Sequence, residues 1–408
     1  MDLDLSQMPP VIRASLYSQM VLGKDVDLAS PQHDYLKMIA ADSGLHCPME
    51  GIAFSFSRDV TDYVLRHHEL FSSDCLMPLG NVRPLIPLNV DPPKQSKYRK
   101  ILDPLFAPKK MDALEGDVTA RANYFIDQFI AKGECNFTED FAELFPSAVF
   151  LSLMGLPWEH LHQLLALRDG ILHSEKINPA AAVDPTARFE VMNSTGQKIY
   201  DYFNAELDAR EAKPTDDILT HFITAQVDGD KMTREEILDL CYLFLIAGLD
   251  TVSDSLTCMW AYLAANPEQR ERIVNDPSVI PNAVEEMLRF ETPVPYGVAR
   301  TATRDVTLPN GATVSQGTAV IVSYGGANID PKEFPDGLEV NFDRPDNRHI
   351  AFGGGVHRCL GSHLARRELR IALAEWHKRI PVYSIKPGHE DLQFPPGLRH
   401  VHDLMLVW

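Results

Sequence analysis

The chain has 408 residues, of which 45% are hydrophobic and 23% charged, an ordinary globular balance with enough apolar material for a large core. Its formal net charge of −19 argues against a general attraction to nucleic acid or to anionic lipid. No stretch approaches the roughly 20 apolar residues that a membrane helix needs, and no internal repeat or long linker divides the sequence. We therefore expect a single domain over residues 1–408, with no membrane segment.

The spacing of apolar residues predicts a mainly helical protein, because they recur every three or four positions through much of the chain. The longest such segment starts with the capping-box pattern Thr233-Arg-Glu-Glu236 and is expected to run unbroken to Pro267 with a buried middle. The predicted helices cover 112–132, 138–155, 158–173, 186–210, 233–265, 267–275, 278–290 and 360–379.

The segments that read as strands are short and lie mostly in the C-terminal half. They are 51–57, 298–308, 319–324 and a pair around 383 and 404. Pro309-Asn310-Gly311 predicts a hairpin turn, and the dense Pro and Gly from Asp330 to Gly355 predict an irregular meander. The fold class is thus mainly α with a small β-rich side (α+β).

The cysteine pattern points to a reducing compartment. Six cysteines are scattered without a Cys-x-x-Cys pair, which argues against a disulfide framework or a structural zinc site. The N-terminus lacks the apolar core of a secretory signal. A cytoplasmic location is the expectation.

The strongest chemical signal is a glycine-rich segment that ends in a cysteine, Phe352-Gly353-Gly354-Gly355-Val356-His357-Arg358-Cys359-Leu360-Gly361. Glycines let the backbone turn tightly and lie against a flat ligand. Cys359 then comes just before a predicted helix, whose N-terminal amides and dipole favour a thiolate over a thiol. Two other interpretations are an inert structural cysteine and a phosphate-binding loop, but no Lys-Ser/Thr follows the glycines.

This segment resembles the haem-binding signature of the cytochrome P-450 family, and the resemblance extends over nearly the whole chain. The layout, including the closing Leu406-Val407-Trp408, is most similar to the camphor-hydroxylase branch of soluble bacterial members. The resemblance implies a fold in which haem b lies between a long central helix and the cysteine loop. It implies that Cys359 ligates the iron and that Phe352, Gly353 and Gly361 shape the loop around the haem.

The segment Ala247-Gly248-Leu249-Asp250-Thr251 is unusual for the middle of a helix on propensity grounds. A threonine hydroxyl can bond to the carbonyl four residues earlier, here Ala247, and loosen the helix beside Gly248. A helix that merely tolerates these residues is the plain alternative. The resemblance assigns the five residues to oxygen activation, with Asp250 and Thr251 relaying protons.

Glu286 and Arg289 are spaced i,i+3 on one helix face, a pattern that is usually exposed and contributes little. The resemblance implies a buried structural pair that engages Arg344 of the meander and holds it near the cysteine loop.

The resemblance also nominates partners for the haem propionates and walls for a substrate pocket. The propionate candidates are Arg99, Arg300, His357 and, more weakly, Gln95. For each arginine, the alternative is an ordinary exposed position. For His357, the alternative is a core position in which its hydrogen bonds are satisfied. The pocket candidates lie in the predicted central helix, the loop 76–88, the strand near 294–298 and the turn at 396–398. They are Leu243, Phe244, Ile246, Ala247, Leu85, Leu88, Val294, Val298 and Leu398.

The substrate is expected to be small and apolar. The tyrosine that camphor hydroxylases use as a ketone anchor is missing, since its place falls near Arg83. A monoterpenoid or norisoprenoid is the leading hypothesis. A steroid or fatty-acid hydroxylase, a peroxide-using haem-thiolate enzyme and a non-catalytic haem sensor are the alternatives.

Oxygen activation needs electrons from outside, because the chain shows no flavin or nicotinamide domain and no cysteine set for an iron–sulfur cluster. Residues 94–110 form a basic stretch in an acidic chain, which could equally be a solvated helix face. The resemblance places it on the haem's proximal side. We expect an acidic 2Fe-2S ferredoxin, supplied by a flavoprotein reductase, to dock on Lys97, Lys100, Lys109, Lys110 and Arg358.

Overall fold

The computed structural model describes residues 26–41, 44–74, 79–227, 229–395 and 397–408. Contacts divide the chain into two compact units, each assembled from separate stretches of sequence. Unit 1 consists of Met1–Ser73, Ala122–Ala142 and Thr251–Trp408, and unit 2 consists of Asp74–Arg121 and Glu143–Asp250. The expectation of one domain over the whole chain stays a prediction.

Unit 2 is almost entirely helical. The predicted capping box is present at α13, where the Thr233 hydroxyl accepts the Glu236 amide at 3.2 Å and the Glu236 carboxylate accepts the Thr233 amide at 2.9 Å. A two-stranded hairpin, β5 (Gln226–Val227) and β6 (Asp230–Lys231), precedes this helix. The helices of unit 2 are α5 (Lys94–Leu102), α6 (Pro108–Asp112), α8 (Leu144–Met154), α9 (Leu161–Leu172), α10 (Ser174–Ile177), α11 (Pro185–Ala212), α12 (Ile218–Thr224) and α13 (Arg234–Gly248).

Unit 1 combines helices with the sheets. Helix α7 (Glu115–Phe129) starts in unit 2 and ends in unit 1. The other helices of unit 1 are α3 (Gln32–Ala40), α4 (Arg58–Arg66), α14 (Thr251–Ala265), α15 (Pro267–Asn275), α16 (Ile280–Glu291), α17 (Tyr324–Ala327) and α18 (Ser362–Arg379). Its strands are β1 (Leu45–Met49), β2 (Ile52–Ser55), β3 (Phe71–Ser72), β4 (Glu134–Asn136), β7 (Arg300–Ala302), β8 (Val306–Thr307), β9 (Thr313–Val314), β10 (Ala319–Val322), β11 (Ser384–Ile385) and β12 (Met405–Val407).

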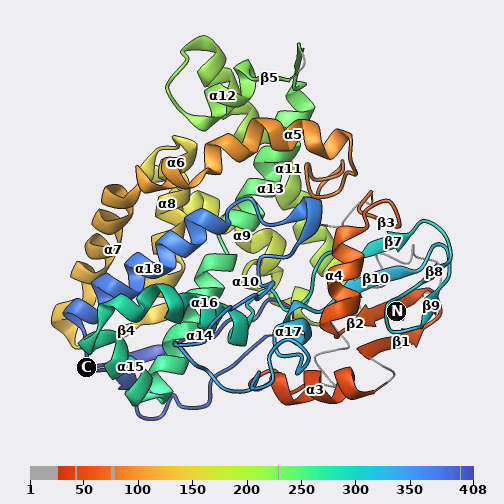
Figure 1. The fold of residues 1–408 in the computed structure, drawn as a ribbon. Coiled ribbons are helices and arrows are strands. Elements are labelled where there is room, and N and C mark those ends of the chain that lie inside the picture. The colour runs from red at the N-terminus through yellow and green to blue at the C-terminus, as the bar shows by residue number, and fades with distance from the viewer. Residues whose placement is uncertain (1–25, 42–43, 75–78, 228, 396) are drawn as a thin grey trace. The chain divides into compact units, whose positions relative to one another are not determined.

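The larger sheet of unit 1 has the order β1-β2-β10-β7-β3, with β10 parallel to β2 and antiparallel to β7 (Figure 1). Helix α4 packs on this sheet through Val60 and Val64, which share a buried cluster with Ala53 and Val320. This packing fixes the C-terminal end of α4, which contacts the cysteine loop described below.

A second packing centre of unit 1 joins α14 to α18. The Trp260 ring stacks on Phe137 with centroids 4.8 Å apart, and Trp376 meets Phe137 edge-on at 5.1 Å. All three rings are fully buried. Because aromatic rings bury a large apolar area, this cluster anchors α18, the helix that follows the cysteine.

The predicted unbroken helix over 233–265 is wrong. The structure has two helices, α13 and α14, separated by Leu249 and Asp250. The physical reason lies at Gly248, a weak helix former, and at Asp250, whose carboxylate is engaged by Arg168 and His173 of unit 2. The sequence indicated a weak point beside Gly248 but not a complete interruption.

Local patterns predicted several other elements well. Helix α15 matches the predicted 267–275, and the predicted hairpin is formed by β8 and β9. Several short elements were not predicted, because so few residues carry little periodic signal. They are helices α3, α4, α5, α6, α10, α12 and α17 and strands β1, β3, β4, β5 and β6.

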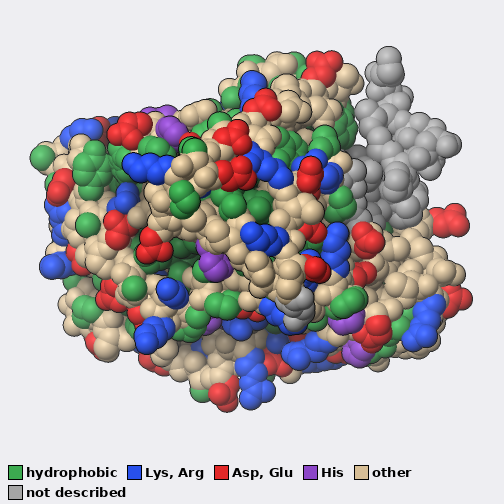
Figure 2. Space-filling view, turned by 90° about the horizontal axis from the view of Figure 1, so that it is seen from above, with side chains coloured by type: hydrophobic (Ala, Val, Ile, Leu, Met, Phe, Trp, Pro, Cys, Tyr) green, Lys and Arg blue, Asp and Glu red, His purple; other side chains and the backbone are tan. Residues whose placement is uncertain are grey.

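Within the described ranges, no helix has both the length and the apolar character needed to cross a membrane. On the face shown in Figure 2, acidic and basic side chains are intermixed, with hydrophobic side chains between them. The acidic excess of the chain is therefore not gathered into a separate region of this face.

Candidate active site

The cysteine loop is held by its own backbone. The Cys359 amide donates to the Phe352 carbonyl at 2.9 Å, and the Gly353 amide donates to the Ile350 carbonyl at 2.8 Å. A single 3-10 turn, η9 (Gly355–His357), lies between them. The loop is thus a closed turn that places Cys359 shortly before α18, as the sequence predicted.

Two glycines of the loop have conformations that other residues rarely adopt, with φ of +66° at Gly353 and +64° at Gly355. A Cβ atom at Gly355 would lie 2.0 Å from the Leu65 carbonyl oxygen of α4. At Gly354, which has extended backbone, a Cβ atom would meet only the Leu65 side chain at 3.5 Å. Gly355 therefore permits a backbone-to-backbone contact that fixes the loop on α4.

Cys359 differs in exposure from three other cysteines of the chain. Its side chain is exposed, whereas Cys135, Cys241 and Cys258 are buried. Burial, and then the nearby guanidinium groups of Arg366 and Arg358, lower the pKa of His363 in the first turn of α18. Cys359 comes three residues before this helix, whose N-terminal amides and dipole favour a thiolate over a thiol.

Arg300 and His357 lie in unit 1 with the cysteine. Arg300 is buried on β7, where its Nη1 donates to the Val298 carbonyl at 3.1 Å. His357 Nε2 lies 3.0 Å from the hydroxyl of the buried Ser73. The Phe352 ring is covered by the guanidinium of Arg366, whose Cζ lies 4.4 Å from the ring centroid.

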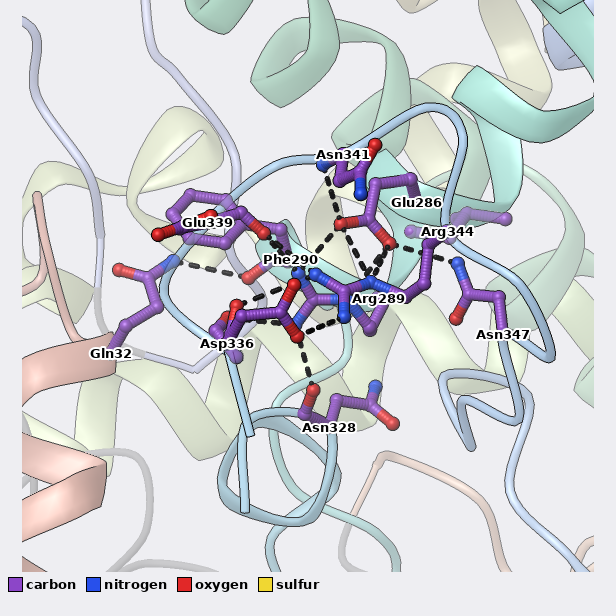
Figure 3. A network of polar contacts seen from close by, with 12 residues as sticks. Gln32, Glu286, Arg289, Phe290, Asn328, Asp336, Glu339, Asn341, Arg344 and Asn347 are labelled. Carbon is purple, nitrogen blue, oxygen red and sulfur yellow. Dashed lines mark hydrogen bonds and ion pairs between the residues drawn. The ribbon is translucent and has the colours of Figure 1, made fainter. Parts of the chain in front are cut away.

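The meander is tied to α16 by the predicted trio, which the structure brings together (Figure 3). Arg289 donates to both carboxylate oxygens of Glu286, from Nε at 2.9 Å and from Nη2 at 2.8 Å. Arg344 Nε also reaches both oxygens, at 3.1 and 3.0 Å. Glu286 and Arg289 are each 0% exposed, so this is a desolvated ion pair with bidentate geometry.

Backbone carbonyls accept the other hydrogen bonds of the Arg289 guanidinium. Its Nη1 donates to Asn328 and Gly337, and its Nη2 donates to Glu339, at 2.8–2.9 Å. Asn341 and Asn347 donate to Glu286, both at 2.9 Å. The network therefore holds five residues of the meander against α16, namely Gly337, Glu339, Asn341, Arg344 and Asn347. Figure 3 shows most of these contacts.

The acid predicted to relay protons lies in a buried cluster of unit 2. Asp250 Oδ2 is 3.0 Å from His173 Nε2, and Asp250 Oδ1 is 3.3 Å from Arg168 Nη1. Gly248, at the end of α13, faces Phe150, since a Cβ atom there would lie 2.9 Å from the ring. Thr251 begins α14 in unit 1, and its carbonyl accepts the Ser255 hydroxyl at 2.8 Å.

Arg168 and His173 were missed by the sequence reasoning. They lie 82 and 77 residues before Asp250 in the chain, on and just after α9, and an isolated Arg or His in a helical pattern carries no signal of its own. A buried acid at a helix break demands cationic or donor partners, which is the signal that could have prompted a search for them.

The remaining haem candidates, Arg99 and Gln95, lie on α5 of unit 2. Arg99 Nε forms an ion pair with Asp103 at 2.7 Å, and Gln95 is buried. Lys97 is 3.7 Å from Asp230 of β6. Lys100, Lys109 and Lys110 are exposed in unit 2, and Arg358 is exposed in unit 1.

The predicted pocket residues differ in burial. Leu85 is fully buried, Ile246 is buried, Ala247 is exposed, and the others are partly exposed. Phe244 packs edge-on against Phe106 and Phe222, with centroids 5.6 and 5.9 Å away. Residues 76–78 and Pro396, which belong to the predicted walls, lie outside the described residues.

Comparison with known proteins decides the family. The family model described as Cytochrome P450 matches residues 59–379. The chain belongs to the cytochrome P450 family. Among curated P450 relatives, it is 34% identical to "Probable cytochrome P450 127A1" of Sinorhizobium fredii over 85% of this chain and 80% of that protein. It is 31% identical to "Mycinamicin IV hydroxylase/epoxidase" of Micromonospora griseorubida over 79% of each.

A solved P450 structure has the same fold. The myxobacterial cytochrome P450 CYP267B1, in complex with myristic acid, superposes with a TM-score of 0.83 at 29% identity and covers 93% of this chain and 96% of that chain. The mainly α class with small sheets is confirmed. That the chain belongs to the camphor-hydroxylase branch stays a prediction.

The protein is therefore a P450 monooxygenase whose cofactor is haem b, bound in this family through a cysteine thiolate. The residues present fit this group. Cys359 is exposed, and a Cβ atom at Gly361 would meet nothing within 4 Å, so the loop has open space two residues beyond the cysteine.

Proposed function

We propose that Cys359 is the thiolate ligand of the haem iron and that the loop 352–361 exists to present it. The observation that carries this proposal is the exposed Cys359 in a loop locked by the Gly355–Leu65 contact, directly before α18. When bound, a thiolate-ligated haem supplies the chemistry that activates O2 for insertion of one oxygen atom into a C–H bond.

We assign the supply of protons for that chemistry to Asp250 and Thr251. A carboxyl group can accept and give protons, and a hydroxyl group beside it can pass them on. The interruption of the helix after Gly248 supports the assignment, because it leaves local backbone groups outside the regular helical ladder.

We propose that Arg300 and His357 of unit 1 and Arg99 of unit 2 hold the haem propionates, with Gln95 in a lesser role. The Arg300 guanidinium is buried and permanently charged, and its planar set of donors suits a carboxylate, which supports its assignment to a propionate. Phe352, Gly353 and Gly361 would shape the cofactor side of the loop.

The proposed substrate is a small apolar molecule, with a monoterpenoid or norisoprenoid as the leading candidate. The apolar character of the nine candidate pocket residues supports a substrate of this kind. Six of them are at least partly exposed and do not show the aromatic packing of Phe244. They are Leu88, Leu243, Ala247, Val294, Val298 and Leu398.

A fatty-acid or steroid hydroxylase is the second candidate. It is favoured by the solved relative that holds myristic acid at 29% identity. A long chain would need a longer apolar channel and a polar group at its end, whereas a compact terpenoid needs neither.

We propose that an acidic 2Fe-2S ferredoxin, reduced by a flavoprotein, delivers the electrons in the cytoplasm. The exposure of Lys100, Lys109, Lys110 and Arg358 supports docking by charge complementarity. Lys97 contributes less, because Asp230 lies within ion-pair distance.

A spectral titration of the purified holoprotein tests the substrate class. Cyclic monoterpenoids and norisoprenoids are expected to shift the Soret band from the low-spin to the high-spin position with saturable binding. If steroids or fatty acids do so and no terpenoid does, the second candidate replaces the first.

A further inference from the structure

The buried acid of unit 2 is held by two cations of different chemistry. Arg168 is 0% exposed and reaches Asp250 Oδ1, while His173, also buried, reaches Oδ2. Arg168 further contacts Glu143 at 3.1 Å. A guanidinium stays protonated at any physiological pH, so it can orient Asp250 but cannot exchange a proton with it.

The imidazole, in contrast, can take up a proton at one ring nitrogen and release a proton from the other. Its Nε2 points to Asp250, and its Nδ1 lies 3.9 Å from the carboxylate of Glu175 on α10. The Glu175 side chain is 42% exposed, whereas that of Asp250 is 4% exposed. A distance of 3.9 Å is too long for a direct hydrogen bond, so a small movement of the partly exposed Glu175 side chain is needed to close the gap or to admit a water.

We propose that His173 carries protons from solvent at Glu175 to Asp250. The inference rests on the proposed role of Asp250 in proton supply. In each transfer the proton on Nε2 moves to Oδ2, so that imidazolium and carboxylate become neutral imidazole and carboxylic acid. Asp250 then passes its proton onward. Rotation of the ring brings the remaining N–H toward Asp250, and the other nitrogen is reloaded from solvent.

The charges around the ring suit this task. Burial alone would lower the pKa of His173, but the Asp250 carboxylate raises it above the ordinary value, against opposing effects of Arg168 and Lys176. The raised pKa increases the share of the protonated ring, which is the form that acts as a donor.

A purely structural role for His173 and a proton relay through it predict different results for the variant His173→Gln. His173→Gln keeps a side chain that can donate to Asp250 but cannot transfer a proton. If the ring only positions Asp250, this variant retains the coupling of electron consumption to product. If the ring relays protons, product formed per pair of electrons consumed falls by roughly tenfold or more. Hydrogen peroxide then rises in compensation, and the solvent deuterium isotope effect on product formation increases.

The pH profile separates the two roles further. The wild-type coupling should decline as the pH rises through the pKa of His173, since the protonated ring is the donor. His173→Gln should lack this decline. Glu175→Gln, which alters only the outer contact, should show an intermediate loss.

A readout independent of turnover is the pKa of His173 itself, measured by NMR in the diamagnetic ferrous carbonyl protein. It should lie above the ordinary value of about 6.5 in the wild type and fall in Asp250→Asn. An unshifted pKa would overturn the proposal, because the ring would then not be coupled to the acid.

Asp250→Asn distinguishes failure of the relay from failure of the proposed function. If Asp250→Asn loses coupling and His173→Gln keeps it, Asp250 works without this relay and the inference is wrong. If Asp250→Asn itself keeps wild-type coupling, the proposed proton supply through Asp250 is wrong as well. Thermal unfolding of each variant identifies any loss that comes from misfolding.

Discussion

The Gly355 backbone lies directly against the Leu65 carbonyl, so closely that a Cβ atom on Gly355 would lie 2.0 Å from that oxygen. Its neighbour Gly354 has no such constraint, with the nearest atom of the Leu65 side chain 3.5 Å from a built Cβ. These two adjacent glycines therefore provide a matched pair of substitutions for the cysteine loop.

Gly355→Ala should displace the loop and greatly reduce the haem content of the purified protein, because both the positive φ and the backbone contact exclude a side chain. Gly354→Ala should retain haem at close to the wild-type level. The haem-to-protein absorbance ratio measures both. Equal haem content in the two variants would contradict the proposed function of the Gly355–Leu65 contact.

Glu286→Gln should destabilise the protein by about 3–5 kcal/mol, because it leaves two guanidinium groups without their buried anion. Urea unfolding of the holoprotein measures the loss. Asp343→Asn is the control from the same meander, since Asp343 is 71% exposed in its ion pair with Arg272 and should contribute about 0–1 kcal/mol. A Glu286→Gln protein as stable as the Asp343→Asn protein would show that the network does not hold the meander.

Glu285, the neighbour of Glu286, should contribute stability that is lost in acid. Burial would raise the pKa of Glu285, but hydrogen bonds from His349 and Arg366 lower it to about 2. A depressed pKa in the folded state contributes stability above the ordinary pKa near 4.5, and this stability is lost as the pH falls toward 2. The difference in unfolding free energy between wild type and Glu285→Gln should therefore be largest near neutral pH and shrink below about pH 4. A difference that is constant across this range would refute the assignment.

Charge reversal at lysines of the basic stretch 94–110 tests the proposed docking of the electron donor. Lys100→Glu and Lys109→Glu should weaken turnover with an acidic ferredoxin, and raising the ionic strength from about 0.05 M to about 0.5 M should reduce the wild-type rate. Lys213→Glu, at an exposed lysine that follows α11, is the control and should retain the wild-type rate. If all three variants behave alike, docking does not depend on this stretch.

The sequence predicted the features that depend on residues close together in the chain. The cysteine loop, the capping box at Thr233 and the hairpin at 309–311 depend on local conformational preference, and each is present. The Glu286–Arg289 pair was also visible as an i,i+3 pattern, although its complete burial came from the resemblance and not from the spacing.

Features that depend on distant partners were not predictable in this way. The contacts of Asp250 with Arg168 and His173 join residues far apart in the chain, and they accompany the break between α13 and α14. Helical periodicity reports which face is apolar, but it does not report that a buried carboxylate will be drawn toward cations of another helix. The proposed proton relay therefore depends on the structure.

The ferrous carbonyl spectrum of the purified protein tests the central claim most directly, together with those of Cys359→Ala and Cys359→His. The wild type and Cys47→Ala, a control at another exposed cysteine, should show the strongly red-shifted band of thiolate ligation, and both Cys359 variants should lose it. A red-shifted band that survives in either Cys359 variant, or is missing from the wild type, would contradict ligation of the iron by Cys359.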